Sequence, residues 1–426
     1  MKKQTIAFLL IIGVSTAVAQ TRTDSCIAYF QEIKQATRQN QQLWNKNLYA
    51  LILLVDPQTR EIITNAQDSA STLSPYKTVF TGRLPDKVNI ANTAMHWNGQ
   101  HWSMVMLPLP KDKKTRINLI AHELFHRAQH SLGLNAHNPD NAHLDEKDAR
   151  IYLRLELESL KKALTATSKS AINSHITNAL AFRKYRYLLY PKADSTESLM
   201  ELNEGICEYT GIMHSGRTSH EMLAYFQEHI DTFIKSPSYI RSFAYEAVPV
   251  YGYLLKSVKP DWNKAINNNT NLASFFETSF GVQLPADLEA HVTKNALQYN
   301  ADIITTEENV RADQIRKQKE AYVQMFLESP ATELPLMNMN MSFDYTKMVS
   351  LNEKGMVYPQ IRITDKWGIL TASKGALISA DWSKARVTFP ISIEGEKISG
   401  DGWTLELSAG YSLVKDDKGS YRLKAK

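Results

Sequence analysis

Two histidines and a glutamate at positions 122–126 form the pattern His-Glu-x-x-His, which can hold a metal ion and activate water. Side chains four residues apart lie one above the other on an α-helix, so His122 and His126 can bring their imidazole nitrogens to one ion. Glu123 then falls beside the open coordination position, where a general base must stand to take a proton from water. The same pattern also occurs by chance on exposed, charged helix faces, so other features must decide between the two interpretations.

The residues around this motif predict the helix that such a site requires. Apolar residues recur at helical spacing through the segment, at Ile117, Ile120, Leu124 and Ala128. Gly133 then stands where a helix would end. We therefore expect one helix to carry both histidines on one face.

The chain opens with the features of an export signal. Lys2 and Lys3 precede an apolar stretch at 6–14, and the small residues of 17–19 form a cleavage site. The apolar stretch is too short to span a bilayer, and no later segment reaches the length of a transmembrane helix. We expect residues 1–20 to be a signal peptide and the protein to be exported and soluble, in the periplasm or outside the cell.

Composition excludes several classes of protein. The chain has 426 residues, of which 43% are hydrophobic, as in ordinary soluble proteins of two or more domains. Its formal charge of +5 falls to +3 without Lys2 and Lys3, which is too mild to argue for nucleic acid as a partner. Two cysteines, Cys26 and Cys207, are too few for a disulfide framework and argue against zinc held by thiolates. Whether the two cysteines pair stays open.

Helical patterns dominate the sequence up to about residue 330. The apolar run at 50–55 is typical of a buried strand. The run at 102–110 is closed by two prolines, which predicts a strand that lies at a sheet edge or ends there. An edge strand directly before the motif could dock an extended peptide. Helices are expected at 24–49, 144–167, 172–189, 197–214, 219–234, 238–256, 285–299 and 307–328.

The composition changes after residue 330. Short β-rich segments separated by Gly and Asp turns follow, for example at 387–393, 403–407 and 421–423. The predicted fold class is α+β. A mainly helical domain with a small N-terminal sheet covers residues 21–330, and a mostly β domain covers 331–426.

A third metal ligand must come from outside the motif helix. A catalytic zinc site takes three protein ligands and leaves one position for water. His130 lies two turns from His122 and cannot reach the same ion along a straight helix. The best candidate lies in the stretch 202–209.

That stretch contains Asn-Glu-Gly-x-x-x-Tyr at 203–209, which, downstream of His-Glu-x-x-His, resembles the gluzincin metallopeptidases. In that family the glutamate of the second helix binds zinc. The resemblance implies a zincin-like fold, a Zn²⁺ ion held by His122, His126 and Glu204, and Glu123 as general base.

The resemblance also implies a role for Glu208. Many gluzincins carry an acid one turn beyond the ligand glutamate, where it hydrogen-bonds a zinc-binding histidine, and such partners orient metal ligands in general. Glu208 occupies that position. The two motifs are further apart than in the most familiar families, so the helices expected within 144–189 would be an insertion.

Three other residues compete with Glu204 for the third position. Glu156 lies at a more usual distance from the motif, and Asp140 and His137 lie in the intervening loop. The charged surroundings of Glu156 also suit a solvated helix face.

Two tyrosines are candidates to stabilise the charge that builds on a carbonyl oxygen during peptide hydrolysis. Tyr245 and Tyr251 follow the second motif in a tyrosine-rich segment, and some gluzincins use a downstream tyrosine in this way. A cluster of core aromatic residues is the simpler explanation for either one.

Together these features predict an exported zinc metallopeptidase that hydrolyses a peptide or protein substrate. Zinc would polarise the scissile carbonyl and acidify a bound water, and Glu123 would pass that water's proton to the leaving amine. The alternative is a binding protein on a degenerate peptidase scaffold, with the C-terminal β domain as binding module. The intact set of His122, Glu123, His126 and Glu204 argues against decay. The bond that is cleaved and the oligomeric state stay open.

Overall fold

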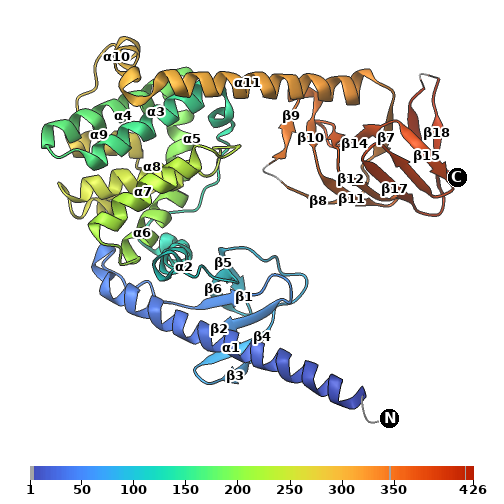
Figure 1. Ribbon diagram of the computed structural model, residues 1–426, viewed down its shortest axis with the longest axis horizontal. Helices are drawn as coiled ribbons and strands as arrows, with labels where there is room; N and C mark the ends of the chain where they lie inside the picture. Colours follow the sequence, from blue (N-terminus) through green and yellow to red (C-terminus); the bar gives the residue numbers. More distant parts are fainter. Residues whose placement is uncertain (1–3, 345–346, 418) are drawn as a thin grey trace. The chain divides into compact units, whose positions relative to one another are not determined.

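The computed structural model describes the backbone of residues 4–344, 347–417 and 419–426, with side chains from residue 22 onward. The predicted signal peptide, residues 1–20, lies outside the residues whose side chains are described. The chain divides into two units, residues 1–304 and 305–426. In the first unit one sheet lies beside a block of helices, and strands dominate the second unit (Figure 1), which confirms the predicted α+β class. The domain boundary near residue 330 stays a prediction.

The sheet of the first unit has the strand order β3-β4-β2-β1-β6-β5. Its strands are β1 (Ile52–Val55), β2 (Glu61–Thr64), β3 (Ser74–Tyr76), β4 (Val79–Arg83), β5 (Thr93–Trp97) and β6 (Gln100–Met106). Strand β6 runs parallel to β1 and antiparallel to β5. The predicted strand at 102–110 therefore ends before its prolines but is internal, and β5 forms the edge of the sheet.

Strand β1 confirms the prediction of a buried strand at 50–55. All four of its residues are buried, and they alternate between two hydrophobic clusters. Ile52 and Leu54 join the core shared with the helices, while Leu53 and Val55 join a smaller cluster on the other face of the sheet. The sheet is thus buried on both faces at its centre.

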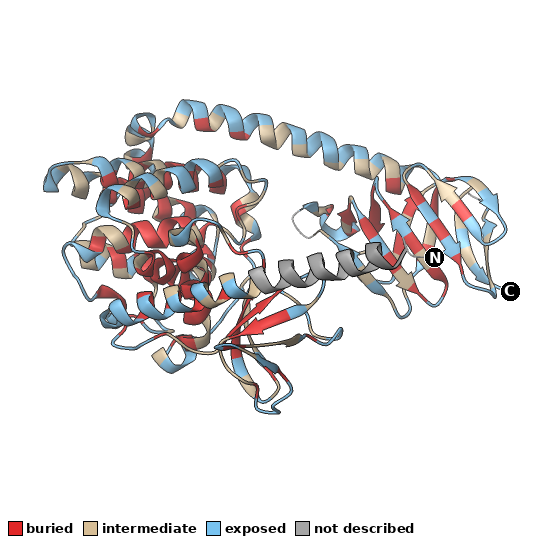
Figure 2. Cartoon of the chain, turned by 60° about the horizontal axis from the view of Figure 1, so that its bottom comes forward, coloured by how far each residue is buried: buried red, intermediate tan, exposed pale blue. Residues whose placement is uncertain are grey.

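The helices of the first unit are mostly those that periodicity predicts. They are α1 (Gln4–Gln39), α2 (Lys113–Ala128), α3 (Lys147–Thr165), α4 (Lys169–Leu189), α5 (Ala193–Met200), α6 (Ile206–His214), α7 (Ser219–Phe233), α8 (Ala244–Lys256), α9 (Leu272–Phe280) and α10 (Leu288–Asn295), with α11 (Ala301–Val323) continuing into the second unit. Helix α2 packs between β6 and α6, and α6 packs against α8. Figure 2 shows buried residues gathered inside this helical block.

The second unit holds two sheets, of strand orders β18-β19-β7-β14-β13-β10-β9 and β15-β16-β17-β12-β11-β8. Their strands are β7 (Ala331–Pro335), β8 (Asn340–Phe343), β9 (Val349–Ser350), β10 (Met356–Tyr358), β11 (Ile361–Asp365), β12 (Gly368–Ala372), β13 (Ala376–Ile378), β14 (Lys384–Thr388), β15 (Pro390–Glu394), β16 (Lys397–Gly400), β17 (Trp403–Leu407), β18 (Tyr411–Lys415) and β19 (Tyr421–Ala425). Residues from both sheets, such as Val387 and Leu405, share one core. The unit is therefore a β-sandwich.

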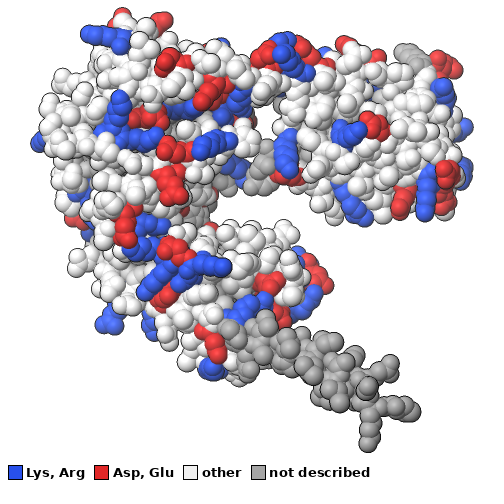
Figure 3. Space-filling view, viewed as in Figure 1, with Lys and Arg blue, Asp and Glu red and all other residues white. Residues whose placement is uncertain are grey.

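Two further features concern the apolar length of the helices and the distribution of surface charge. Among the residues that the structure describes, no helix is long and apolar enough to cross a membrane. On the face drawn in Figure 3, acidic and basic side chains are interspersed rather than gathered by sign. That face offers no broad basic patch of the kind that nucleic-acid binding needs.

Candidate metal centre

Helix α2 holds the His-Glu-x-x-His motif, as predicted, and its start is fixed by a cap. The Asp112 side chain accepts a hydrogen bond from the Thr115 backbone N–H, which satisfies one of the free donors at the helix start. Ser103 of β6 donates its hydroxyl to the backbone carbonyl of Glu123 over 3.1 Å. The middle of α2 is therefore held between the sheet and α6.

The second motif lies where a helix changes its winding. The predicted helix at 197–214 consists of α5, a π-helical turn η4 (Glu201–Gly205) and α6. Gly205 is needed there, because a Cβ at this position would lie 2.7 Å from the Val248 side chain and 2.9 Å from the Ala244 carbonyl oxygen. π-turns inside helices are frequent at functional sites, and this one contains Glu204.

The two motifs bring three donor atoms together. His122 Nε2 lies 3.1 Å from His126 Nε2, and Glu204 Oε2 lies 3.5 Å from the first nitrogen and 3.2 Å from the second. We call these three atoms the donor triangle. His122 and His126 lie on α2, and Glu204 lies about 80 positions later in η4, which leads into α6. Helices α2 and α6 pack directly against each other.

The donor triangle has the size that zinc requires. Zinc binds imidazole nitrogen and carboxylate oxygen at about 2.0–2.2 Å, and a tetrahedron with such bonds has edges of about 3.3–3.5 Å. The separations of 3.1, 3.5 and 3.2 Å agree with this to within a few tenths of an ångström. Two neutral imidazoles and one carboxylate are also a donor set that zinc favours.

Each histidine of the triangle is held at its outer nitrogen. His122 Nδ1–H donates to Glu208 Oε2 over 2.9 Å, and His126 Nδ1–H donates to Gln129 Oε1, also over 2.9 Å. Asn118 in turn donates to the other oxygen of Glu208, over 2.8 Å. These bonds direct the lone pair of each Nε2 toward the triangle.

Gln129 is a site residue that lies outside the two sequence motifs. Its Nε2 donates to the carbonyl oxygens of Asn203, over 2.8 Å, and Leu202, over 3.3 Å. Those carbonyls belong to the π-turn, so one buried amide links His126 to the segment that carries Glu204. The spacing of three residues after His126 is a signal that the sequence does contain, because such positions share a helix face.

Glu123 stands beside the triangle as a buried carboxylate. It is 5% exposed, and its Oε2 has no hydrogen-bond partner among the described residues. Burial raises the pKa of Glu123, and the neighbouring His122 and His126 act in the opposite direction. A carboxylate that is dehydrated and unpartnered is a stronger base than one in water, as a proton acceptor must be.

Electrostatics favour a cation at the triangle. Burial lowers the pKa of His122, but hydrogen bonds to Glu204 and Glu208 outweigh it and raise that pKa to about 10. For Glu204, burial raises the pKa, but the hydrogen bonds from both histidines outweigh it, so the net shift is downward. The carboxylates thus create a potential that holds positive charge, whether that charge is a proton or a metal ion.

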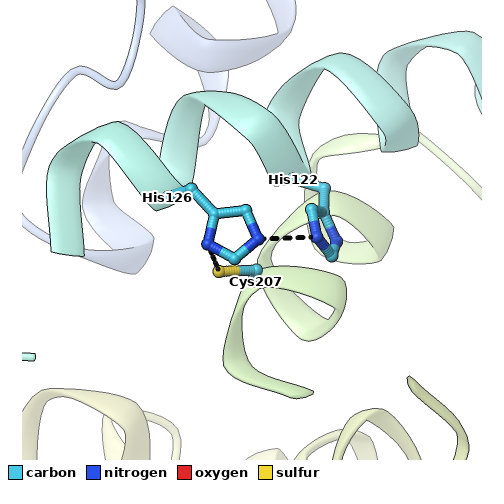
Figure 4. Close-up of side chains that lie close together, drawn as sticks. All are labelled: His122, His126 and Cys207. Atoms are coloured by element: carbon cyan, nitrogen blue, oxygen red, sulfur yellow. Dashed lines mark hydrogen bonds between the residues drawn. The ribbon is translucent and has the colours of Figure 1, made fainter. Parts of the chain in front are cut away.

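Cys207 offers a second possible donor. His122, His126 and Cys207 have donor atoms that all lie within 4.8 Å of one another. Figure 4 shows Cys207 approaching His126 from α6, and its Sγ lies 3.3 Å from Nδ1 of that histidine. Nδ1 is the outer nitrogen of His126, which faces away from the donor triangle, whereas Nε2 of both histidines lies next to Glu204. The sulfur also donates to the Asn203 carbonyl over 2.9 Å, and burial raises the pKa of the thiol well above its ordinary value, so Glu204 fits better as third ligand.

The cysteines do not pair in this structure. Cys26 and Cys207 are both buried and both free. Cys26 lies in α1, in the core that packs the helices together, and burial raises the pKa of its thiol to about 11.

Of the two candidate tyrosines, Tyr245 lies at the site. Its hydroxyl donates to Glu204 Oε2 over 2.6 Å, and its ring stacks on the His122 ring with centroids 5.4 Å apart. Tyr251 lies elsewhere. It is fully buried and donates to Glu156 Oε1 over 3.1 Å, so the prediction of a catalytic Tyr251 is corrected to a structural one.

Among the described residues, no contact joins any of the three competing ligands to the donor triangle. Glu156 is fully buried rather than solvated, and both of its oxygens accept hydrogen bonds from arginines, one from Arg183 at 2.7 Å and one from Arg186 at 3.0 Å. Asp140 is exposed and accepts from the Ala142 backbone N–H, and His137 is exposed in the same loop.

Comparison of the chain with protein-family models, with curated proteins and with solved structures finds no match.

Proposed function

We propose that the chain is a zinc-dependent metallopeptidase. The observation that carries this proposal is the donor triangle of His122, His126 and Glu204 beside the buried, unpartnered carboxylate of Glu123. Three ligands with a base next to them are the set that metal-assisted hydrolysis needs. The resemblance to gluzincins in both motifs supports the same assignment.

Each side chain has a part in the proposed reaction. Zinc bound at the triangle would polarise the scissile carbonyl and lower the pKa of water. Glu123 takes a proton from the attacking water and delivers it to the leaving amine. Glu208 and Gln129 keep the two histidines oriented. The Tyr245 hydroxyl donates to Glu204 in this structure, and in the reaction it would turn to donate to the oxygen that gains charge.

The edge of the first sheet supports a peptide as substrate. Among the described residues, strand β5 has no partner on its outer side, and it packs against α2. An extended peptide can add to such an edge through backbone hydrogen bonds. This assigns to β5 the docking role that the sequence suggested for the strand now seen as β6.

We also infer that the chain is exported, from the lysines, apolar stretch and small residues of its first 20 positions. Expression in a bacterial host tests this. The protein recovered from outside the cytoplasm should begin at or near residue 20, and retention of Lys2 and Lys3 would contradict export.

Replacement of the base tests the reaction. Glu123→Gln should bind one zinc per chain, as the wild type does, and should lose casein hydrolysis by about 10³-fold or more because no carboxylate takes the proton. His122→Ala should lose both zinc and activity. Wild-type hydrolysis by Glu123→Gln would contradict the mechanism, and a wild-type chain that takes up no zinc would contradict the proposal itself.

A further inference from the structure

A pocket of about 390 Å³ lies beside the candidate metal centre, between α7, α8 and the start of α2. Tyr225 forms part of its wall and donates its hydroxyl to Glu208 Oε1 over 3.3 Å. Glu208 in turn holds the outer nitrogen of His122. One side chain thus joins the wall of the pocket to the acid that orients a metal ligand.

The inner part of this pocket carries a carboxylate without a partner. Glu246 lines it and is 8% exposed, and its carboxylate has no hydrogen bond or ion pair among the described residues. Burial, together with the like charge of Glu208, raises the pKa of Glu246 to about 8. A buried carboxyl group that nothing compensates destabilises the folded chain, whereas a bound cation would stabilise it.

The remaining walls suit the apolar stem of a long side chain. Phe233 is buried and Tyr225 half-buried, while Glu228 and Thr232 are exposed and lie at the entrance. Aromatic walls hold methylene groups and also attract cations through their π faces. The order from outside to inside is therefore polar rim, aromatic wall and buried carboxylate.

Arg217, which stacks on the Tyr225 wall of the pocket, does not pair with Glu246 among the described residues. The Arg217 guanidinium lies 3.9 Å from the Tyr225 ring centroid and donates to Thr115 over 3.4 Å. No ion pair joins it to Glu246, and it is not among the residues that line the pocket.

A metal ion is a poorer match than an organic cation. His229 and Glu228 also line the pocket, but the group of three such donors found among the described residues lies at the candidate metal centre and not in this pocket. Acidic groups spread around an aromatic cavity fit a monovalent cation on a flexible stem.

We propose that this pocket binds the side chain of a lysine or arginine of the substrate, with the Glu246 carboxylate as its counter-ion. That the cation belongs to a peptide substrate rests on the proposed peptidase function, whereas the binding of a cation by this pocket does not. The pocket would make a basic residue near the scissile bond a determinant of specificity.

Binding is tested first without catalysis, on the full-length Glu123→Gln protein. N-butylguanidinium should bind to it, as measured by calorimetry, and N-butylurea, a neutral compound of nearly the same shape, should bind about tenfold more weakly or worse. Adding Glu246→Gln should abolish this preference, whereas adding Glu289→Gln, an exposed acid on α10, should not. Equal affinity for the two compounds would overturn the proposal, even if the Glu246 variant failed to fold.

Specificity is tested second, on the active wild type with a mixed peptide library. Cleavage sites should be enriched in Lys or Arg at one position, and N-butylguanidinium should inhibit competitively. If the cation binds but does not compete with peptides, the pocket is not a substrate subsite and the proposal fails. If the cation binds selectively and no peptide is cleaved at all, the proposed function fails while the cation pocket stands.

Discussion

At the scale of single residues, the centre of the first unit has an excess of negative charge. Glu123, Glu204 and Glu208 surround two histidines, and all five side chains are largely withdrawn from solvent. A proton on the His122 imidazole can balance part of this charge, as the raised pKa of His122 indicates. A dication at the donor triangle would balance it more fully, which gives a physical reason for metal uptake.

Tyr245→Phe should lower kcat by about 10–100-fold and leave one zinc bound, because the hydroxyl acts on charge in the transition state and is not a ligand. The measurement is kcat on a peptide substrate, together with zinc content. Tyr251→Phe is the matched control, since its hydroxyl bonds to Glu156. It should keep kcat and cost about 1–2 kcal/mol of stability. Equal kcat values for the two variants would remove Tyr245 from the mechanism.

Glu246→Gln should change how stability depends on pH. The pKa of Glu246 is raised from 4.5 to about 8 in the folded chain, so the unfolded chain releases this proton first and stability falls as pH rises between those values. From pH 6 to pH 9 the wild type should lose about 2–3 kcal/mol more than Glu246→Gln. Urea unfolding at both pH values measures this. Parallel losses in the two proteins would mean that the carboxyl group is not dehydrated.

At the scale of elements, the π-turn η4 and helix α2 are joined by one buried amide. Gln129→Leu removes both the acceptor for His126 and the donor to the π-turn carbonyls. Zinc affinity should fall by about 10–100-fold, which is the usual cost of losing a ligand's partner. A competition with a zinc chelator measures it.

Gln129→Glu is the matched variant, because it keeps an acceptor for His126 while losing the amide donor. It should retain more zinc affinity than Gln129→Leu. If the two variants bind zinc as tightly as the wild type, Gln129 does not orient the ligand.

A buried ion network fixes the helices between the two motifs. Glu156 pairs with Arg183 and Arg186, which also hold Glu201 and Glu197, and all five side chains are fully buried. Glu201 is the first residue of the π-turn, so the network reaches the segment that carries the third ligand.

Glu156→Gln should destabilise the chain by about 1–3 kcal/mol, because it weakens two charge-assisted hydrogen bonds and places an amide N–H₂ against a buried guanidinium. Zinc content should remain at one per chain. Thermal unfolding and metal analysis of the same sample give both quantities. Loss of zinc without a loss of stability would instead make Glu156 a ligand.

At the scale of the whole molecule, sequence patterns correctly predicted the elements that depend mainly on residues close together in the chain. The motif helix, the buried strand β1 and the change to strands after residue 330 all follow from periodicity and composition. The π-turn, the edge position of β5 and the burial of Glu156 depend on contacts between distant segments. For that reason Glu156 resembled a solvated acid in the sequence, although two arginines some 30 positions away enclose it.

The metal centre was predictable only where its residues belong to short sequence motifs. Motif spacing pointed to His122, Glu123 and His126, and the family resemblance pointed to Glu204 and Glu208. Gln129 belongs to the site through its contact with a backbone that only the fold brings close.

The central claim is that zinc is held by His122, His126 and Glu204. The most direct test is a crystal of the full-length protein grown with zinc, with anomalous diffraction recorded at the zinc absorption edge. The strongest peak should lie about 2.0–2.2 Å from His122 Nε2, His126 Nε2 and Glu204 Oε2. A peak bonded to Cys207 Sγ or Glu156, or no peak at the donor triangle, would contradict the claim.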